Sequence, residues 1–371
     1  MQGMLSHTER RDALRLARSQ GVGPVMFADL MRRFEGPSEA LEALPDLARR
    51  AGRASPLNIV SRQQAEAEID AGDALGAQLL IIGEDGYPAR LAAIDGAPPV
   101  IWLRGRSELI AGQTVAIVGA RVASAAGQRF ARELALDLGE AGCIVVSGMA
   151  RGIDAAAHEG SVATGSVAVL AGGVDDIYPM ENRRLYDRLI EDGCIVSERP
   201  PGLKAKAQDF VRRNRIISGL SLAVVVVEAE VRSGSLTTAR LAGEQGREVL
   251  AVPGSPLDPR AKGTNDLIRN GAALCEGADD VLRTLGALSH MLEPTHERWL
   301  ALPAQITHDS DALRERLAAL LSPTPVSRDE LARACDGPAS AVFAALMELS
   351  LAGRAELLSG GLIVASQESL R

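Results

Sequence analysis

Positive charge is concentrated in one short stretch of this chain. Arg212, Arg213 and Arg215 lie within four positions in FVRRNRIISGLSLAVVVVEA, residues 210–229. Residues 204–215 contain five basic side chains and one acidic side chain, a local charge of +4, whereas the whole chain has 40 Lys and Arg against 48 Asp and Glu, a net charge of -8. Because charges within a Debye length of about 8–10 Å dominate what a ligand experiences, this stretch can attract an anion that the net charge would repel.

Glycines, hydroxyls and arginines also follow the apolar runs that predict strands. Val118 is followed by GARVASAAG, Val146 by SGMARGIDAAAH and Val227 by EAEVRSGSLTTAR. Glycine lets the backbone approach a ligand, the N–H groups of a first helical turn are unpaired, and the helix dipole favours an anion. One such turn is usually just a tight βα turn that needs glycine, but several of them with arginines predict a phosphate-binding edge. The candidate residues from these patterns are Gly119, Arg121, Ser124, Ser147, Gly148, Arg151, Gly152, Lys206, Arg212, Arg213, Arg215, Arg232, Gly234 and Ser235.

The elements that would hold these residues form an α/β pattern. Short apolar runs alternate with segments of helical length over residues 77–287, which favours parallel strands joined by right-handed crossovers. The run LAVVVV at 222–227 is apolar on both faces, as a strand covered by helices on both sides must be. The sequence therefore predicts an extended Rossmann-like core, a doubly wound and mostly parallel sheet, with the candidate residues at the carboxyl ends of its strands.

Two smaller modules flank this predicted core. Residues 1–75 have the pattern of short helices, and GVGP at 21–24 resembles the turn of SAM-like and helix-hairpin-helix modules. The backbone amides of this turn could face a phosphate, or its glycines could serve only the tight turn. Residues 288–308 are polar and contain proline, as a linker would. Residues 309–371 predict three helices and a hairpin, which is a winged-helix fold.

The third predicted helix of the winged-helix module lacks the charge that a DNA-reading helix needs. Its sequence, ASAVFAALMELSLAG, carries Glu348 and no Lys or Arg. A recognition helix enters the groove of a polyanion, where basic side chains are favoured. We therefore expect this helix to contact protein or to serve packing rather than to read DNA.

Composition argues against several other classes of function. The four cysteines are scattered without a CxxC pair and none of the five histidines is paired at metal-ligand spacing, so we expect buried free thiols and no metal site. The first strand is followed by GAR rather than a complete dinucleotide fingerprint, and neither a Walker sequence nor a GxSxG elbow is present. No cofactor and no catalytic residue are therefore predicted. Neither a secretory signal nor an apolar run of membrane-spanning length is visible, and we expect a cytoplasmic protein that makes no membrane contact.

Ordered motifs along nearly the whole chain resemble those of the DNA-processing protein A (DprA/Smf) family. They include VAIVGARVAS, VVSGMARGIDAAAH, VAVLAGGVDDIYPMEN, FVRRNRIISGLS and VVEAEVRSGSLTTARLAGEQGREVLAVPGS. The resemblance implies a SAM-like module, an extended Rossmann core and a winged helix. It also implies a homodimer that binds single-stranded DNA without catalysis, protects it and helps to load the RecA recombinase during uptake of transforming DNA.

The resemblance also implies roles for individual residues. It places Arg121 in a glycine-arginine turn that contacts phosphate, and the block from Phe210 to Arg215 in the same basic pocket, which adds Phe210 and Asn214 to the candidate residues. Ala120 replaces the usual Ser or Thr of the family, which removes one possible hydrogen bond, and Ala207 stands where a pocket lysine is common, with Lys206 one position away. Phe210 could stack on a base or pack against the following helix, and both roles remain open.

Two other classes of function remain to be weighed against single-strand binding. Phosphoribohydrolases, nucleotide-processing enzymes on a related fold, hold a ribose phosphate and a catalytic carboxylate at the turn that here reads RSGSLTTAR. Ala239 or Arg240 stands where their glutamate would be, although Glu228 and Glu230 are near. A regulator that reads duplex DNA through its winged helix is disfavoured by the apolar third helix.

Helical spacing divides the arginines of the basic stretch. Over residues 212–220, Arg212, Arg215 and Gly219 share one helical face. We therefore expect Arg121 and Arg215 to form the principal DNA-binding pair, and Arg213 to hold a neighbouring carboxylate.

Overall fold

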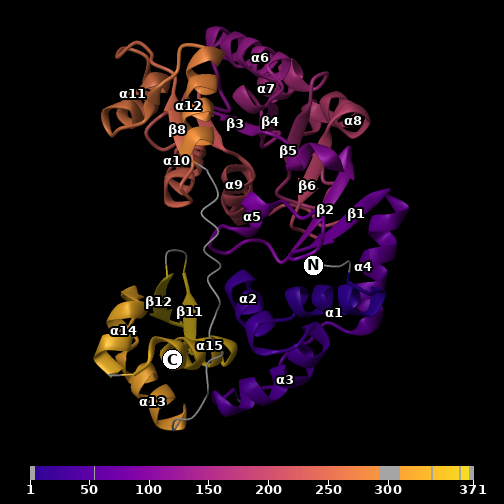
Figure 1. Ribbon diagram of the computed structural model, residues 1–371, viewed down its shortest axis with the longest axis vertical. Helices are drawn as coiled ribbons and strands as arrows, with labels where there is room; N and C mark the ends of the chain where they lie inside the picture. The colour runs from indigo at the N-terminus through magenta and orange to yellow at the C-terminus, as the bar shows by residue number, and fades with distance from the viewer. Residues whose placement is uncertain (1–4, 54, 292–309, 336, 359–360, 367–371) are drawn as a thin grey trace. The chain divides into compact units, whose positions relative to one another are not determined.

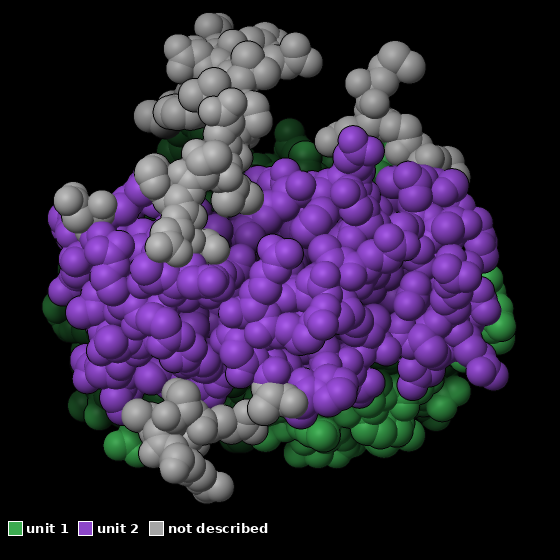
Figure 2. Space-filling model, turned by 90° about the horizontal axis from the view of Figure 1, so that it is seen from below, with its two compact units in different colours: residues 1–4, 67–294 green, residues 5–66, 295–371 purple. Residues whose placement is uncertain are grey.

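The chain forms two compact units, shown as ribbons in Figure 1 and as surfaces in Figure 2. Unit 1 contains residues 67–294 with residues 1–4, and unit 2 contains residues 5–66 and 295–371. Among the described residues, no helix combines the length and the apolar character that a membrane crossing requires. The computed structural model describes residues 5–53, 55–291, 310–335, 337–358 and 361–366.

Unit 1 is built on a nine-stranded sheet with the order β1-β2-β6-β5-β4-β3-β7-β8-β9. Neighbouring strands from β6 through to β9 pair in parallel, and β1 and β2 form an antiparallel edge. The predicted doubly wound, mostly parallel sheet is confirmed. The strands are β1 (Ala77–Ile81), β2 (Val100–Gly105), β3 (Thr114–Val118), β4 (Ile144–Ser147), β5 (Ser166–Val169), β6 (Cys194–Ser197), β7 (Ala223–Val226), β8 (Glu248–Ala251) and β9 (Ala273–Leu274).

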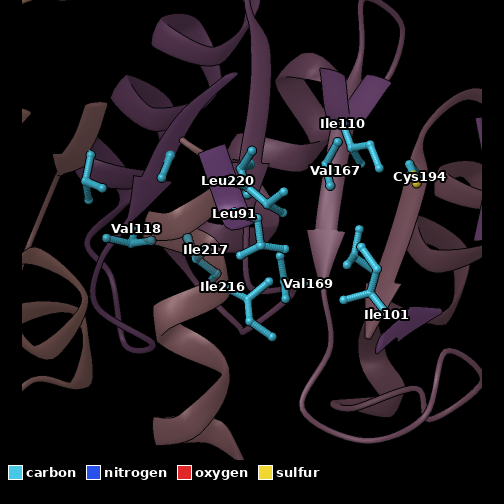
Figure 3. Packing of buried hydrophobic residues seen from close by; sticks show 14 of the residues in the cluster. Leu91, Ile101, Ile110, Val118, Val167, Val169, Cys194, Ile216, Ile217 and Leu220 are labelled. Atoms are coloured by element: carbon cyan, nitrogen blue, oxygen red, sulfur yellow. The ribbon is translucent and has the colours of Figure 1, made fainter. Parts of the chain in front are cut away.

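Helices cover both faces of this sheet, which explains why its central strands are apolar throughout. Successive side chains of a strand point to opposite faces. Val118 accordingly packs in one buried cluster with Leu91 and Leu220, shown in Figure 3, while Ile117 packs in the other cluster with Leu138. The helices of unit 1 are α5 (Ala89–Ala92), α6 (Ala125–Glu140), α7 (Ile153–Ser161), α8 (Arg183–Asp192), α9 (Ala207–Leu220), α10 (Gly234–Glu244), α11 (Lys262–Arg269) and α12 (Ala278–Met291); α4 (Arg62–Ala74) begins in unit 2.

Unit 2 joins segments from both ends of the chain. Its N-terminal helices are α1 (His7–Arg18), α2 (Pro24–Arg33) and α3 (Pro37–Arg50). Ser6 and Glu9 form a capping box at the start of α1, and Pro24 opens α2, where its missing N–H is not needed. The turn between these helices is the predicted GVGP hairpin.

The C-terminal part of unit 2 has the predicted winged-helix arrangement. Its elements are α13 (Ser310–Leu320), β10 (Val326–Ser327), α14 (Arg328–Cys335), α15 (Ala339–Leu351), β11 (Ala355–Leu357) and β12 (Leu362–Ala365), and the strands pair antiparallel in the order β10-β12-β11. Helix α12 continues to Met291, so the start of the linker predicted at 288–308 is helical, and residues 292–308 lie outside the described residues. The predicted domain boundaries themselves stay predictions.

Candidate nucleic-acid interface

A cavity of about 480 Å³ lies at the carboxyl edge of the sheet, beside the ends of β3 and β7. The strand order reverses here, because the chain leaves β3 toward β4 and later returns on the other side as β7. Open parallel sheets hold ligands at such switch points. Among the candidate residues, the cavity is lined by Gly119, Arg121, Phe210, Arg213, Asn214, Arg232, Gly234 and Ser235.

One face of α9 forms a wall of this cavity. Phe210, Arg213, Asn214 and Ile217 line it, at the i, i+3, i+4, i+7 spacing of residues that share a helical face. This face lies next to the face predicted from the sequence, which carries Arg212, Arg215 and Gly219. The chemistry of the wall is mixed, because a ring, a guanidinium, an amide and an aliphatic side chain meet on it.

Arg213 places a buried guanidinium at the cavity. The residue is 6% exposed, and its Nη1 donates to the carbonyl oxygen of Gly148 at 2.6 Å and to that of Val169. Burial lowers the pKa of Arg213 to about 10, with the carboxylate of Asp154 opposing the shift and the charge of Arg121 adding to it. Arg213 is therefore charged at neutral pH, beside a second arginine. An anion between Arg121 and Arg213 would offset the repulsion between them.

The carboxylate expected beside Arg213 is that of Asp154. The hydrogen bonds of Arg213 run to backbone carbonyls, and Asp154 acts on it electrostatically. One oxygen of Asp154 accepts the N–H of Gly148 at 3.1 Å and that of Ala150 at 3.4 Å. Burial raises the pKa of Asp154, and Arg213 opposes that change. Asp154 thus fixes the turn after β4 against which the Arg213 guanidinium lies.

Arg121 and two aromatic rings stand together beside the cavity. The Cζ atom of Arg121 lies 5.4 Å from the centroid of the Phe210 ring. The centroid of the Tyr178 ring lies 5.2 Å from the Phe210 centroid, and the planes of the two rings form an angle of 58°. Tyr178 is 54% exposed. It was absent from the candidate residues because its turn after β5, GGVDDIYP, carries no cation. The sequence feature that could have identified Tyr178 is an aromatic residue in a turn at the carboxyl edge of the sheet.

Arg215 does not reach this cavity. Its Nη2 donates to both oxygens of Glu198, at 2.6 and 2.7 Å. The face of α9 that carries Gly219 packs closely, since a Cβ on Gly219 would lie 2.8 Å from Ile94 and 2.9 Å from Leu91. The cavity therefore brings Arg121 together with Arg213 and not with Arg215, and the expected DNA-binding pair of Arg121 and Arg215 stays a prediction. Arg212 is exposed and is not among the residues that line the cavity.

The turn between β7 and α10 forms a further wall. Ser233 is the N-cap of α10, and its Oγ accepts the N–H of Ser235 at 3.4 Å. The carbonyl oxygen of Gly234 accepts from the side-chain amide of Asn214 at 3.3 Å, which joins this turn to α9. Arg232 is exposed at the same turn. The wall therefore offers a helix N-terminus, hydroxyls and a cation, which together suit a phosphate.

Two candidate residues hold the edge together from within. Ser147 is fully buried, and its Oγ donates to the carbonyl oxygen of Ile117 at 2.6 Å. Gly152 has a φ of 76°, and a Cβ there would collide with the carbonyl oxygens of Ala120 and Arg121. Only glycine allows the turn after β4 to approach the turn that carries Arg121 so closely.

Besides Arg212, two further basic candidate residues lie at the surface outside the cavity lining. Arg151 forms an exposed ion pair with Glu181 at 2.5 Å. Lys206 precedes α9 as its exposed N-cap, and its backbone N–H donates to Asp209 at 2.9 Å. These residues can add to the electrostatic field at the edge without forming a wall of the cavity.

Ser124 binds a carboxylate of this chain. Its N–H and its hydroxyl donate to Glu228 at 2.9 and 2.5 Å, while its Oγ accepts the N–H of Gly127 and caps α6. Glu228 follows β7 and so places a negative charge at the N-terminus of the first crossover helix. Dinucleotide-binding folds hold a pyrophosphate at that position. The incomplete fingerprint of the sequence thus coincides with a position that the protein fills with its own carboxylate.

The acidic pair in the turn after β5 has a structural role. Asp175 accepts the N–H of Gly202 and Asp176 accepts the N–H of Ala205, both at 2.8 Å. Within the described part of the chain, no group of three or more His, Cys, Asp or Glu residues is placed to hold a metal ion. The four cysteines are buried free thiols, as expected.

Comparisons with known proteins match all three parts of the chain. The family model described as DNA recombination-mediator protein A matches residues 78–286, the DprA-like N-terminal HHH domain matches residues 7–71, and the DprA winged helix domain matches residues 301–361. The chain belongs to the DprA/Smf family. The resemblance seen in the sequence motifs is thereby confirmed.

Several curated proteins are similar to this DprA/Smf chain in sequence. Protein Smf of Escherichia coli is 38% identical over 280 residues, which cover 75% of this chain and 74% of the relative. The DNA processing protein DprA of Bacillus subtilis is 41% identical over 213 residues, 57% of this chain and 72% of the relative. The putative DprA of Mycobacterium tuberculosis is 33% identical over 354 residues, 91% of this chain and 87% of the relative.

Two solved structures of the family resemble this one. DNA processing protein A from Streptococcus pneumoniae superposes with a TM-score of 0.64 at 31% identity, covering 76% of this chain and 98% of that one. DNA processing protein A from Helicobacter pylori, described for its single-stranded DNA binding mode, gives a TM-score of 0.53 at 26% identity, covering 57% of this chain and 96% of that one.

Proposed function

We propose that this chain binds single-stranded DNA without sequence specificity in the cavity at the carboxyl edge, with a backbone phosphate between Arg121 and Arg213. The convergence of these two guanidinium groups on one cavity carries the proposal. Like charges held near one another favour an anion between them. Because Arg213 is buried, water screens its charge only weakly. The single-stranded DNA binding mode described for the Helicobacter pylori protein supports the same choice of ligand.

The rings beside the phosphate position favour single strands over duplexes. Phe210 and Tyr178 lie next to Arg121, and bases can stack on aromatic side chains only when they are unpaired and unstacked. Every base has a π-face, and backbone phosphates carry no sequence information. Binding through these groups is therefore indifferent to sequence.

We further infer a role for the complex with single-stranded DNA. A homodimer of this chain would protect the single strand and help to load the RecA recombinase during natural transformation, in the cytoplasm. The family description as a DNA recombination mediator supports this role. Two cavities in one dimer would also hold one strand at two points, which raises avidity without any new contact.

We propose binding rather than catalysis at this site. A phosphoribohydrolase-like reaction needs a carboxylate near the ribose phosphate, and the carboxylates in or beside the cavity are Asp154, Glu228 and Glu230. Asp154 is buried and accepts the N–H groups of Gly148 and Ala150. Glu228 is engaged with Ser124 at the start of α6, whereas Glu230 is exposed and lines the cavity. Incubation with nucleoside monophosphates should release neither base nor phosphate. Release that disappears in Glu230→Gln would favour the enzyme instead.

The test of binding is a salt titration of affinity for single-stranded and duplex DNA. Each phosphate contact on a single strand contributes about 0.7 to the slope of log affinity against log salt. Arg121→Ala should weaken single-strand binding and reduce that slope by about 0.7. Arg129→Ala is the matched control, because Arg129 is an exposed α6 arginine paired with Glu133. Unchanged affinity in folded Arg121→Ala, or tighter binding of duplex than of single strand, would contradict the proposal.

A further inference from the structure

Helix α15 of the winged-helix module is apolar on two faces. Val342, Leu346 and Leu349 belong to the hydrophobic core of that module. Met347 and Leu351 do not belong to it, yet each is only 1% exposed. Residues four apart share a helical face, so Met347 and Leu351 mark a second buried face. A segment outside the winged-helix core must cover it.

The N-terminal helices of unit 2 cover this second face. Helix α15 contacts α3, and a Cβ placed on Gly21 of the hairpin would lie 3.7 Å from the Leu351 side chain. The Cζ atom of Arg32, in α2, lies 5.9 Å from the centroid of the Phe343 ring. Phe343 is in the first half of α15 and Leu351 is its last residue. The contact therefore runs along most of the helix.

A hydrogen-bonding residue fixes the end of this contact. Arg53 donates through Nη1 to the carbonyl oxygen of Leu351 at 2.9 Å, through Nη2 to the side chain of Gln20 at 3.1 Å and through Nε to the carbonyl oxygen of Ser55 at 3.1 Å. The Leu351 carbonyl is among the last four of α15, which have no partner within the helix. A single guanidinium thus joins the end of α15 to the turn that follows α1.

The helix that carries this second buried face is the one whose composition disfavours DNA reading. A winged helix reads duplex DNA by placing its third helix in the major groove. Here α15 carries no Lys or Arg, and its one acidic residue, Glu348, is paired with Arg314 at 2.5 Å. The hairpin glycine Gly21, whose module could otherwise present backbone amides to a phosphate, lies against Leu351.

We propose that the second face of α15 is a protein-binding surface whose partner is the N-terminal helical module of the same chain, so that neither the winged helix nor the GVGP hairpin contacts DNA while the two are docked. This inference goes beyond single-strand binding in unit 1 and does not depend on it. It gives the apolar third helix a function and assigns the winged helix to intramolecular assembly.

Hydrogen exchange on the full chain tests the docking. Leu351→Asp places a carboxylate in the buried contact, and we expect amides of α3 and of the hairpin to exchange at least about tenfold faster. Leu320→Asp is the matched control, because Leu320 is an exposed leucine of the same module, and it should leave those amides unchanged. Unchanged exchange in α3 and the hairpin of Leu351→Asp would overturn the proposal.

Two further measurements keep the test decisive if Leu351→Asp unfolds the winged helix. Arg53→Ala alters no winged-helix residue, and it should speed exchange in the last turn of α15; unchanged exchange there would count against the docking. A duplex oligonucleotide added to the wild-type chain at low salt should leave exchange of α15 and the hairpin unaltered. Protection of either segment by duplex DNA would show that these surfaces are DNA-binding.

Discussion

The Cζ atom of Arg121 lies 5.4 Å from the centroid of the Phe210 ring. The arginine follows β3 and the ring belongs to α9, so the contact joins two elements that are distant in sequence. A guanidinium held near a ring loses less conformational freedom when it binds a phosphate than one that moves freely in water. We therefore infer that Phe210 positions Arg121 for the proposed phosphate contact.

Removing this ring should weaken single-strand binding modestly. Cation–π contacts at exposed sites contribute about 0.5–1 kcal/mol, which corresponds to a two- to fivefold loss of affinity in Phe210→Leu. Phe210→Tyr retains the ring and should bind like the wild type. Fluorescence anisotropy with a labelled oligonucleotide measures both variants, and equal affinities for leucine and tyrosine would show that the ring does not position Arg121.

Two arginines of α9, Arg213 and Arg215, should differ in how much they contribute to the stability of the fold. Arg213→Ala removes a buried cation that donates to two carbonyls and faces Asp154, and we expect it to lower the free energy of unfolding by about 3–5 kcal/mol. Arg215→Ala breaks a partly exposed pair with Glu198 and should cost about 1 kcal/mol or less. Urea denaturation gives both values. Single-strand affinity of Arg215→Ala should match the wild type, and a loss as large as that of Arg121→Ala would restore the pairing expected from sequence.

Tyr178 should contact a base. The ring is 54% exposed beside Phe210, and stacking of one base on an aromatic side chain is worth about 1–3 kcal/mol. Tyr178→Ala should therefore bind an ordinary single strand about fivefold or more weakly, while Tyr178→Phe keeps its affinity. An abasic oligonucleotide separates stacking from folding effects. If Tyr178→Ala loses as much affinity for the abasic strand, the ring does not stack on a base.

Stability should fall in mild acid because of one histidine. His158 is fully buried with Nδ1 2.8 Å from the Ser166 hydroxyl, and burial lowers the pKa of His158 from 6.5 to about 3. Between those values the unfolded chain binds a proton that the folded chain excludes, so lowering the pH through this window favours unfolding. The loss is about 1.4 kcal/mol per pH unit. Urea denaturation at pH about 7 and about 5 should show a smaller loss in His158→Gln, and an identical loss in both proteins would refute this origin.

The fold could be predicted from sequence because its signals are local. A strand covered on both faces must be apolar at every position, and the run LAVVVV has this pattern at β7. Glycines after apolar runs likewise mark turns at the carboxyl edge. The grouping of α15 with the N-terminal helices depends on contacts between residues more than 290 positions apart, such as Arg53 with Leu351 at a separation of 298. Only the missing charge of α15 hinted at it.

The site was predicted less completely, because it depends on which side of α9 faces the cavity and on contacts between residues far apart in the sequence. The basic stretch identified α9, but the side of α9 that faces the cavity depends on Gly219, whose close contact with Leu91 and Ile94 comes from a distant segment. The helical face that lines the cavity is the neighbour of the predicted face, so Arg213 lies at the cavity where Arg215 was expected. The role of Ser124 was equally hidden, because its partner Glu228 is 104 residues away.

The carboxylate of Glu228 at the start of α6 limits which ligands can bind at that helix. A dinucleotide approaching that helix would meet a negative charge already held by the N–H and hydroxyl of Ser124, and the two anions would repel. The start of α6 is thus unfavourable for the redox cofactors that related folds bind at this position.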